Sequence, residues 1–457
     1  MKTQSTSSGG STRIIAIIVM FFVYAMISFV TNLAAPIGTI WGHHFEGNNV
    51  LGMMGNMMNF LAYLFMGIPA GNLLVKIGYK KTTLAALVVG VIGLFIQYIS
   101  GRVGDGVVVG TLGSMTVHLN YIIYLLGAFV CGFCVCMLNT VCCPMLNLLG
   151  GGGNKGNQLL QSAGAFNSLA GTLTPLLVGV LIGQLTKETS MIEVSPLLII
   201  GMAIFVVAGV IVYMVQIPEP GNNNSNVKKV AYTHSPWNFR HTVLGVIAIF
   251  FYVGIEVGIP GTLNFYLADQ TARGAGVIGD ASAIAGAIVA IYWLLMLVGR
   301  SLSAVISSVV STRAQLLTVS SVAIVLIVIS ICIPKEVTIP VPEALYSGGA
   351  TVPVSAMLLI FCGLCTSIMW GSIFNLAVEG LGKYTAQASG IFMMMVVGGG
   401  LMPLLQNYIA DLEGYMTSYW LVVAMLAYIF FYALAGSKNV NTDIPVLEED
   451  TIDPRSL

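Results

Sequence analysis

Charged residues are scarce in this sequence. Of its 457 residues, 8% are Asp, Glu, Lys or Arg and 57% are hydrophobic. Soluble domains carry about 25% charged residues, so this chain has too few to cover a surface that faces water. Lys and Arg number 18, as do Asp and Glu, and the formal net charge is zero. The composition therefore predicts a multi-pass membrane protein and gives no electrostatic reason to expect a nucleic-acid partner.

Catalytic and nucleotide-binding signatures are also missing. Residues 380–385 read GLGKYT, without the GK[ST] ending of a phosphate-binding loop. No HExxH or GxSxG motif stands in an interpretable context. Five of the eight cysteines crowd residues 131–143 without a histidine among them, and we interpret them as small hydrophobic residues. We expect no enzyme activity, cofactor, zinc site or disulfide.

Long apolar runs fill the sequence instead. A helix of about 20 apolar residues spans the hydrocarbon core of a bilayer. The first run is too long for a signal-peptide core and no small-residue cleavage site follows it, so we interpret it as an uncleaved first helix. Twelve spans are predicted, over residues 14–41, 50–76, 82–101, 119–147, 158–185, 195–217, 242–267, 281–309, 314–333, 353–380, 384–410 and 414–436.

The distribution of Lys and Arg predicts the orientation. With the N-terminus inside, thirteen of these residues lie in inner segments and four in outer ones. Inner loops of membrane proteins carry the excess of positive charge. We therefore predict a membrane protein with both termini cytoplasmic. The remaining one, Arg300, lies near the inner end of a span, where we expect it to snorkel or to cap a helix end.

The spans divide into two similar halves. Residues 161–166 (QSAGAF) and 387–392 (QASGIF) open spans that stand six helices apart. Parallel repeats with a binding site near the membrane midplane are typical of transporters. The predicted fold is an all-α membrane protein of two six-helix bundles. The domains are 1–217, a cytoplasmic linker 218–241, a second bundle 242–436 and an acidic cytoplasmic tail 437–457.

Deep within these spans there is almost no carboxylate except Glu256. An ionisable group inside the bilayer is costly, and it is by default a candidate for function. We predict Glu256 as the ion-coupling residue, with a structural hydrogen bond to a neighbouring helix as the alternative.

Amide side chains are the other polar feature of the spans. An amide offers both donors and an acceptor, which suits sugar hydroxyl groups, although amides also join neighbouring helices. Aromatic side chains add flat apolar faces for a sugar ring. The predicted substrate-binding residues are Asn32, Asn56, Tyr63, Asn139, Asn167, Asn264, Trp293 and Asn375.

Several short motifs, taken in order, resemble one family. They include residues 68–71 (IPAG), 76–80 (KIGYK), 252–256 (YVGIE), 373–376 (IFNL) and 398–400 (GGG). Together they resemble the fucose permease and glucose/galactose transporter branch of the major facilitator superfamily, over nearly the whole membrane portion. Residues 76–80 resemble the superfamily's signature in the loop between the second and third helices, without its usual acidic residue.

The resemblance implies sugar uptake, usually coupled to a cation. Proton-coupled fucose permeases carry carboxylates where this chain has Asn32 and Asn139, and a glutamine where it has Gly164. The usual proton-binding pair is therefore missing. We expect import of a hexose or small oligosaccharide by symport with a proton or sodium ion. The alternatives are an uncoupled facilitator, an efflux transporter for another solute, and a membrane sugar sensor that transports nothing.

Overall fold

The structure is a computed structural model that describes residues 7–45, 49–112, 115–182, 189–217, 219, 234–269, 271–278, 281–343, 346, 349–441 and 443–446. Its helices are α1 (Ser7–His44), α2 (Asn49–Ser100), α3 (Leu119–Gly150), α4 (Gly153–Ile182), α5 (Ser195–Met214), α6 (Arg240–Ala268), α7 (Ala281–Ile306), α8 (Thr312–Cys332), α9 (Val354–Thr366), α10 (Met369–Ala377), α11 (Thr385–Met394), α12 (Gly398–Glu413) and α13 (Tyr415–Phe431). Short turns of helix are η1 (Pro236–Asn238), η2 (Gly382–Tyr384), η3 (Met395–Val397) and η4 (Tyr432–Gly436). Two antiparallel hairpins pair β1 (Val108–Leu112) with β2 (Met115–His118), and β3 (Thr338–Pro340) with β4 (Thr351–Pro353).

All twelve predicted spans contain helix, and the predicted fold class is confirmed. By length and composition, ten described segments can cross a membrane. One of them, Met54–Ser100, is 47 residues long and holds two spans. The remaining span is α4, of which the side chains of residues 175–182 lie outside the described residues. The predicted linker 218–241 lies largely outside the described residues.

The two spans of α2 meet at Gly78, where the backbone leaves the helical region. Gly78 has φ +84°, a left-handed conformation that favours glycine. The next span begins here, and its first backbone N–H groups need partners. Glu219, which follows α5, accepts from the backbone N–H of Tyr79 and of Lys80 at 2.8 Å each. This carboxylate stands at a helix N-terminus, where negative charge is stabilising, although the loop signature itself lacks an acid.

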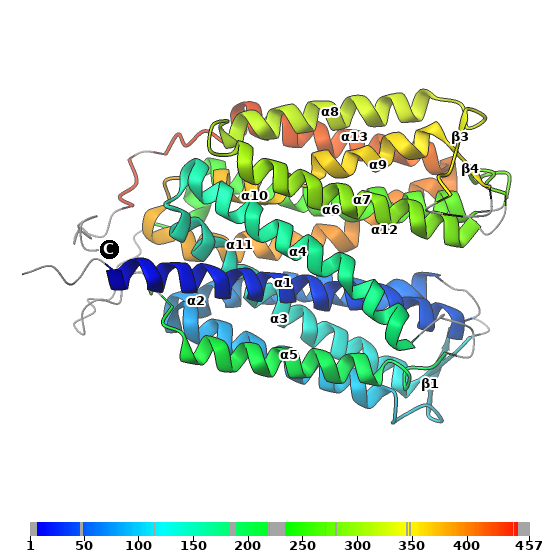
Figure 1. Ribbon diagram of the computed structural model, residues 1–457, viewed down its shortest axis with the longest axis horizontal. Helices are drawn as coiled ribbons and strands as arrows, with labels where there is room; N and C mark the ends of the chain where they lie inside the picture. Colours follow the sequence, from blue (N-terminus) through cyan, green and yellow to red (C-terminus); the bar gives the residue numbers. More distant parts are fainter. Residues whose placement is uncertain are drawn as a thin grey trace, which may run out of the picture.

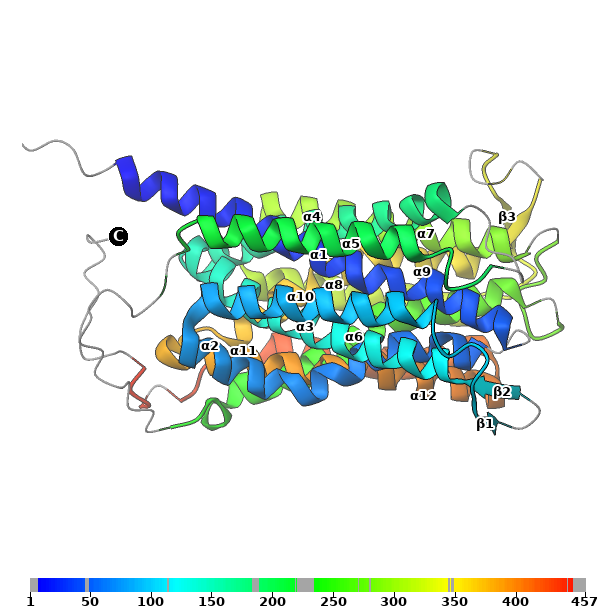
Figure 2. The ribbon, with the colours of Figure 1, turned by 90° about the horizontal axis from the view of Figure 1, so that it is seen from below.

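The helices run side by side along the long axis of the molecule (Figure 1). We call the end where α1 begins the terminal end, and the end that carries the strands the hairpin end. Both hairpins lie at the hairpin end in the two views (Figures 1 and 2). One hairpin joins the third span to the fourth, and the other joins the ninth to the tenth. The repeated position supports the predicted internal duplication.

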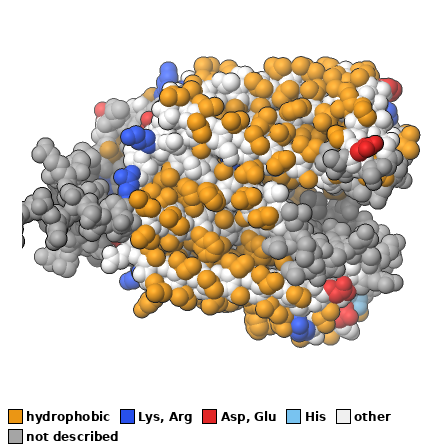
Figure 3. All heavy atoms as spheres, viewed as in Figure 1, with side chains coloured by type: hydrophobic (Ala, Val, Ile, Leu, Met, Phe, Trp, Pro, Cys, Tyr) orange, Lys and Arg blue, Asp and Glu red, His pale blue; other side chains and the backbone are white. Residues whose placement is uncertain are grey.

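The surface has the pattern of a membrane protein. Large apolar side chains are exposed along the helices, including Phe65, Phe95, Val206 and Trp420. Figure 3 shows apolar side chains covering the middle of this face, with most of its Lys and Arg side chains toward the terminal end. A soluble protein would bury such apolar area, whereas here it faces lipid.

We call residues 7–217 the first half and residues 234–446 the second half. They pack against each other where α2 meets α11 and where α4 meets α7. At the first crossing the backbones nearly touch. A Cβ atom on Gly67 would lie 2.5 Å from the backbone nitrogen of Met394 and 2.7 Å from the carbonyl oxygen of Gly390. Small residues of this kind permit close helix packing in membranes. The close approach of α2 and α11 therefore depends on glycine at position 67.

Replacing Gly67 with leucine should force α2 and α11 apart. Overpacking costs about 1–3 kcal/mol, which shifts a two-state equilibrium roughly 5–150-fold. The measurement is the rate of maleimide labelling of Asn157→Cys. This position is chosen because Asn157 is buried between the halves and bonded to Ser307. The exposed Cys332 is replaced by serine in the same protein so that it does not react. Labelling should accelerate by that factor. Gly209→Leu is the matched control, since nothing lies within 4 Å of a Cβ atom there. Equal labelling rates in both variants would contradict the expectation.

Candidate functional site

The centre of the candidate site is a buried ion pair between α6 and α7. Arg300 Nη2 lies 3.1 Å from Glu256 Oε1, and the two side chains are 10% and 16% exposed. Glu256 is in the middle of α6. Among the described residues this is the only ion pair within 4 Å. A buried charge is tolerated in a protein when it is paired and hydrogen-bonded, and each of these two supplies the other's counter-charge.

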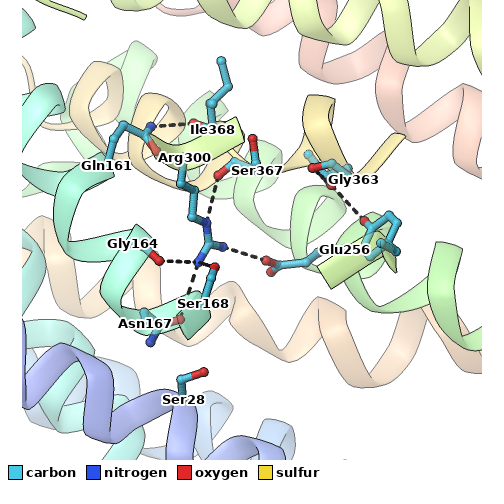
Figure 4. A network of polar contacts seen from close by, with 12 residues as sticks. Ser28, Gln161, Gly164, Asn167, Ser168, Glu256, Arg300, Gly363, Ser367 and Ile368 are labelled. Atoms are coloured by element: carbon cyan, nitrogen blue, oxygen red, sulfur yellow. Dashed lines mark hydrogen bonds and ion pairs between the residues drawn. The ribbon is translucent and has the colours of Figure 1, made fainter. Parts of the chain in front are cut away.

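Arg300 also joins the two halves of the molecule. Its Nη1 donates to the carbonyl oxygen of Gly164 at 3.1 Å, to Ser168 Oγ at 2.8 Å and to Asn167 Oδ1 at 3.5 Å. All three acceptors belong to α4, in the first half. Figure 4 shows the guanidinium between these α4 residues on one side and Glu256 on the other. The side chain of Arg300 therefore contacts the Glu256 carboxylate in the second half and the α4 helix in the first half.

Two local features of the sequence make room for this contact. A Cβ atom on Gly164 would lie 3.1 Å from Arg300 Cδ, so a larger residue there would crowd the arginine. The helix between α9 and α10 is interrupted at Ser367 and Ile368. Their carbonyl oxygens accept from Arg300 Nε at 3.1 Å and from Gln161 Nε2 at 2.9 Å. Irregular backbone at membrane depth persists only where such partners satisfy it.

The expectation that Arg300 snorkels to the surface is wrong, whereas its alternative, that Arg300 caps a helix end, is confirmed for α9: Arg300 Nε donates to the carbonyl oxygen of Ser367, the C-cap residue of that helix. The residue lies six positions before the end of α7, which would allow snorkelling. Side chains on a helix, however, lean toward its N-terminus, and for α7 that direction leads into the molecule. Arg300 follows it to Glu256 and to α4.

The predicted residues of the first half form pairs rather than a single cluster. Asn139 Nδ2 donates to Tyr63 Oη at 2.8 Å, and both side chains are buried. Asn32 Nδ2 donates to the carbonyl oxygen of Ser28, one turn earlier, at 2.8 Å. Asn167 holds the backbone of α1 through the carbonyl oxygen of Tyr24 at 2.7 Å. Asn56, on α2, is half-buried.

In the second half the predicted residues lie at different depths. Trp293 is 37% exposed and precedes Arg300 by seven residues, so the two share a face of α7. Asn264 is half-buried two turns beyond Glu256 toward the hairpin end. Asn375 is buried near the terminal end of α10, where it accepts from Asn147 and donates to the carbonyl oxygen of Gly153 at 3.0 Å. Asn375 is thus away from the ion pair.

A row of polar residues on α4, which the sequence analysis did not select, closes the terminal end. Asn157 Nδ2 donates to Ser307 Oγ at 3.0 Å, and Gln161 contacts Ile368 as described above. Positions 157, 161, 164 and 168 recur at helical spacing on one face, and that spacing was the signal available in the sequence. In the described part of the chain, the hydrogen bonds between the halves run from the level of Arg300 to the terminal end: those of Thr140, Asn147, Gly153, Asn154, Asn157, Gln161, Gly164, Asn167 and Ser168.

Comparison with known proteins identifies the class. The sequence matches the profile of the Major Facilitator Superfamily over residues 17–403. The chain belongs to this superfamily. It is therefore a multi-pass membrane transporter rather than an enzyme, as the sequence predicted.

Individual relatives cover nearly the whole chain. A glucose/galactose transporter from Brucella abortus is 30% identical over 427 residues, covering 92% of this chain and 93% of that protein. The L-fucose-proton symporter of Escherichia coli is 22% identical over 404 residues, covering 83% of each. The crystal structure of the transporter FucP in the outward conformation matches with a TM-score of 0.70 at 20% identity, covering 92% of this chain and 98% of that one. This structural likeness supports the fold alone.

Proposed function

We propose that this protein imports a hexose or a small oligosaccharide across a bacterial inner membrane by cation-coupled symport. The names of its relatives support the substrate class, because they include glucose/galactose transporters and a fucose symporter. Our proposed architecture is two six-helix bundles, 1–217 and 242–436, that rock around a site between them.

The orientation follows from charge. Arg13, Lys81, Lys155, Arg240 and Lys383 all lie at or beside the terminal end of their helices. The excess of Lys and Arg marks the cytoplasmic face of a membrane protein. With the terminal end cytoplasmic, both termini are inside. The hydrogen bonds between the halves then close the cytoplasmic side, as an outward-facing transporter requires.

The single observation that carries the coupling proposal is the Arg300–Glu256 pair. While Glu256 is charged, it holds the guanidinium that also bonds to α4. A proton or a sodium ion on the carboxylate neutralises it and weakens its attraction for Arg300. Cation binding to Glu256 in the second half therefore changes the contact between Arg300 and α4, which holds the two halves together. That link is what a symporter needs between its ion and its conformational step.

We propose that the amide and aromatic side chains predicted from the sequence bind the sugar. We propose Asn32, Asn56, Tyr63, Asn139 and Asn167 from the first half, and Asn264 and Trp293 from the second. The pairs Asn139–Tyr63 and Asn32–Ser28 already satisfy each other's polar groups. A sugar hydroxyl would replace one of these bonds at little net cost. Asn375 is proposed with the same set, acting from the terminal end of the site.

Uncoupled facilitation is the second candidate, and a specific observation favours it. Asn32 and Asn139 are amides that form neutral hydrogen bonds, and neither can release a proton. In a facilitator the ion pair would be a structural tie between the halves with no role in energy coupling.

Counterflow in proteoliposomes tests the transport proposal itself. Vesicles loaded with one unlabelled hexose at a time should take up the same labelled hexose transiently above equilibrium, with no ion gradient imposed. Symporter and facilitator both predict this overshoot for at least one sugar of the panel. A sensor would bind labelled sugar without an overshoot. Absence of any overshoot across hexoses and their disaccharides would reject sugar transport.

A further inference from the structure

A groove at the terminal end lies outside the site between the halves. It has a volume of about 340 Å³ and runs between α1, the end of α3 and the start of α4. Ligand pockets in proteins typically enclose roughly 300–1,000 Å³. Its lining includes Arg13, Ile17, Leu149, Lys155, Gln158 and Leu159.

The charge of this groove is one-sided. Arg13 and Lys155 are exposed cations, and the helices α1, α3 and α4 contain no Asp or Glu at all. Lys155 lies in the first turn of α4, where the helix N-terminus adds partial positive charge. Arg13 donates through Nε and Nη2 to the carbonyl oxygen of Leu149, and this bond places its guanidinium at the groove. The groove thus offers cations without a carboxylate from its own helices to pair with them.

The position of the groove places it at the membrane boundary. The apolar span of α1 begins at Arg13, and the side chains that follow it, Ile14, Ile15 and Ile18, are 59%, 45% and 61% exposed. Ile17, Leu149 and Leu159 add apolar lining to the groove itself. A molecule that fills it would therefore contact cations at one end and an apolar, lipid-facing helix at the other.

We propose that this groove binds an anionic phospholipid. Arg13 and Lys155 hold the phosphate, Gln158 donates to a headgroup oxygen, and the acyl chains lie along the exposed face of α1. Basic pockets between membrane helices on the cytoplasmic side are suited to such headgroups. The site is on α4, the helix that also carries Gln161, Gly164 and Ser168, so a bound lipid would rest against the helix that meets Arg300. The proposal does not depend on which solute the protein carries.

The alternative occupant of the groove is the chain's own acidic tail. Residues 447–457 include Glu448, Glu449, Asp450 and Asp453, and they lie outside the described residues. We favour lipid because the groove is partly apolar and opens beside an exposed membrane-spanning face, which a tail of this composition would leave uncovered.

Native mass spectrometry of the full-length protein tests the proposal. The detergent-purified protein is titrated with phosphatidylglycerol or, separately, with phosphatidylethanolamine of the same chain length. We expect preferential retention of phosphatidylglycerol by the wild type. Retention by Lys155→Gln should be roughly fivefold lower, the effect of losing one cation near an anionic surface. Arg13→Lys, which keeps the charge, should retain more lipid than Arg13→Gln. Lys81→Gln removes an exposed cation of α2 at the same end and should behave as wild type.

Three results would overturn the inference. The first is equal retention of the two lipids by the wild type. The second is equal retention of phosphatidylglycerol by Lys155→Gln and Lys81→Gln. The third is binding of phosphatidylglycerol that emerges only when residues 447–457 are deleted, which would assign the groove to the tail. The side chain of Lys155 makes no hydrogen bond or ion pair with another described residue, so its replacement should leave the fold intact.

Discussion

Glu256→Gln should lose concentrative sugar uptake while it retains sugar exchange. The amide has the shape of the carboxyl group and can still accept from Arg300, so the contact between α6 and α7 survives. It cannot bind a proton in the relevant range or supply charge for a sodium ion. The accumulation ratio under an imposed ion gradient should therefore fall to unity, whereas counterflow stays within a few-fold of wild type. Uptake and counterflow in the same proteoliposome preparation provide both readings.

The matched control for that variant is Glu336→Gln. Glu336 is an exposed carboxylate at the hairpin end, far along the chain from the ion pair. The Glu336→Gln variant should accumulate sugar as the wild type does. If Glu256→Gln also accumulates sugar against its gradient, the carboxylate is dispensable for coupling, and the pair with Arg300 is structural.

Arg300→Ala should have the largest effect on stability. The side chain makes a salt bridge and four hydrogen bonds from a buried position. Removing one member of a buried ion pair costs about 3–5 kcal/mol. A thermal melt in detergent should show a clear loss, with transport lost as well. Arg300→Lys keeps the charge but not the planar fork that reaches several acceptors at once, so it should fall between alanine and wild type.

A double-mutant cycle separates the pair from the other contacts of Arg300. Glu256→Gln with Arg300→Gln leaves no unpaired charge in the membrane. The double variant should therefore be more stable than the sum of the two single losses indicates, and the coupling energy is the stability due to the pair. Additive losses would mean that the two side chains do not interact, contrary to the 3.1 Å contact.

Hydropathy predicted the spans well because lipid leaves the backbone no choice but helix. The breaks within spans were harder to predict. The interruption at Ser367 and Ile368 has no proline or glycine at these two positions, and its carbonyl partners, Arg300 and Gln161, come from other helices. A break that depends on tertiary partners leaves little trace in the local sequence.

The residues of the candidate site also differ in whether the sequence could predict them. Glu256 was predictable because a lone carboxylate in a span stands out by composition alone. Its partner was not, since the sequence gives the depth of Arg300 along α7 but not the direction of its side chain. The partner of Asn139, Tyr63, comes from another helix and depends on packing that the sequence does not encode locally, whereas Asn32 bonds to Ser28 one turn earlier on its own helix. The stripe of Asn157, Gln161 and Ser168 was visible as helical periodicity, but polar residues near a helix end are commonly solvent-exposed.

Uptake of a labelled hexose by the wild-type protein, under separately imposed proton and sodium gradients, tests the central claim most directly. The vesicles should accumulate the sugar above its external concentration under one of the two gradients, and should only equilibrate it under the other. That result would identify the coupling ion in a protein that has amides at positions 32 and 139. Equilibration alone, unaffected by either gradient, would contradict cation-coupled symport and make the protein a facilitator.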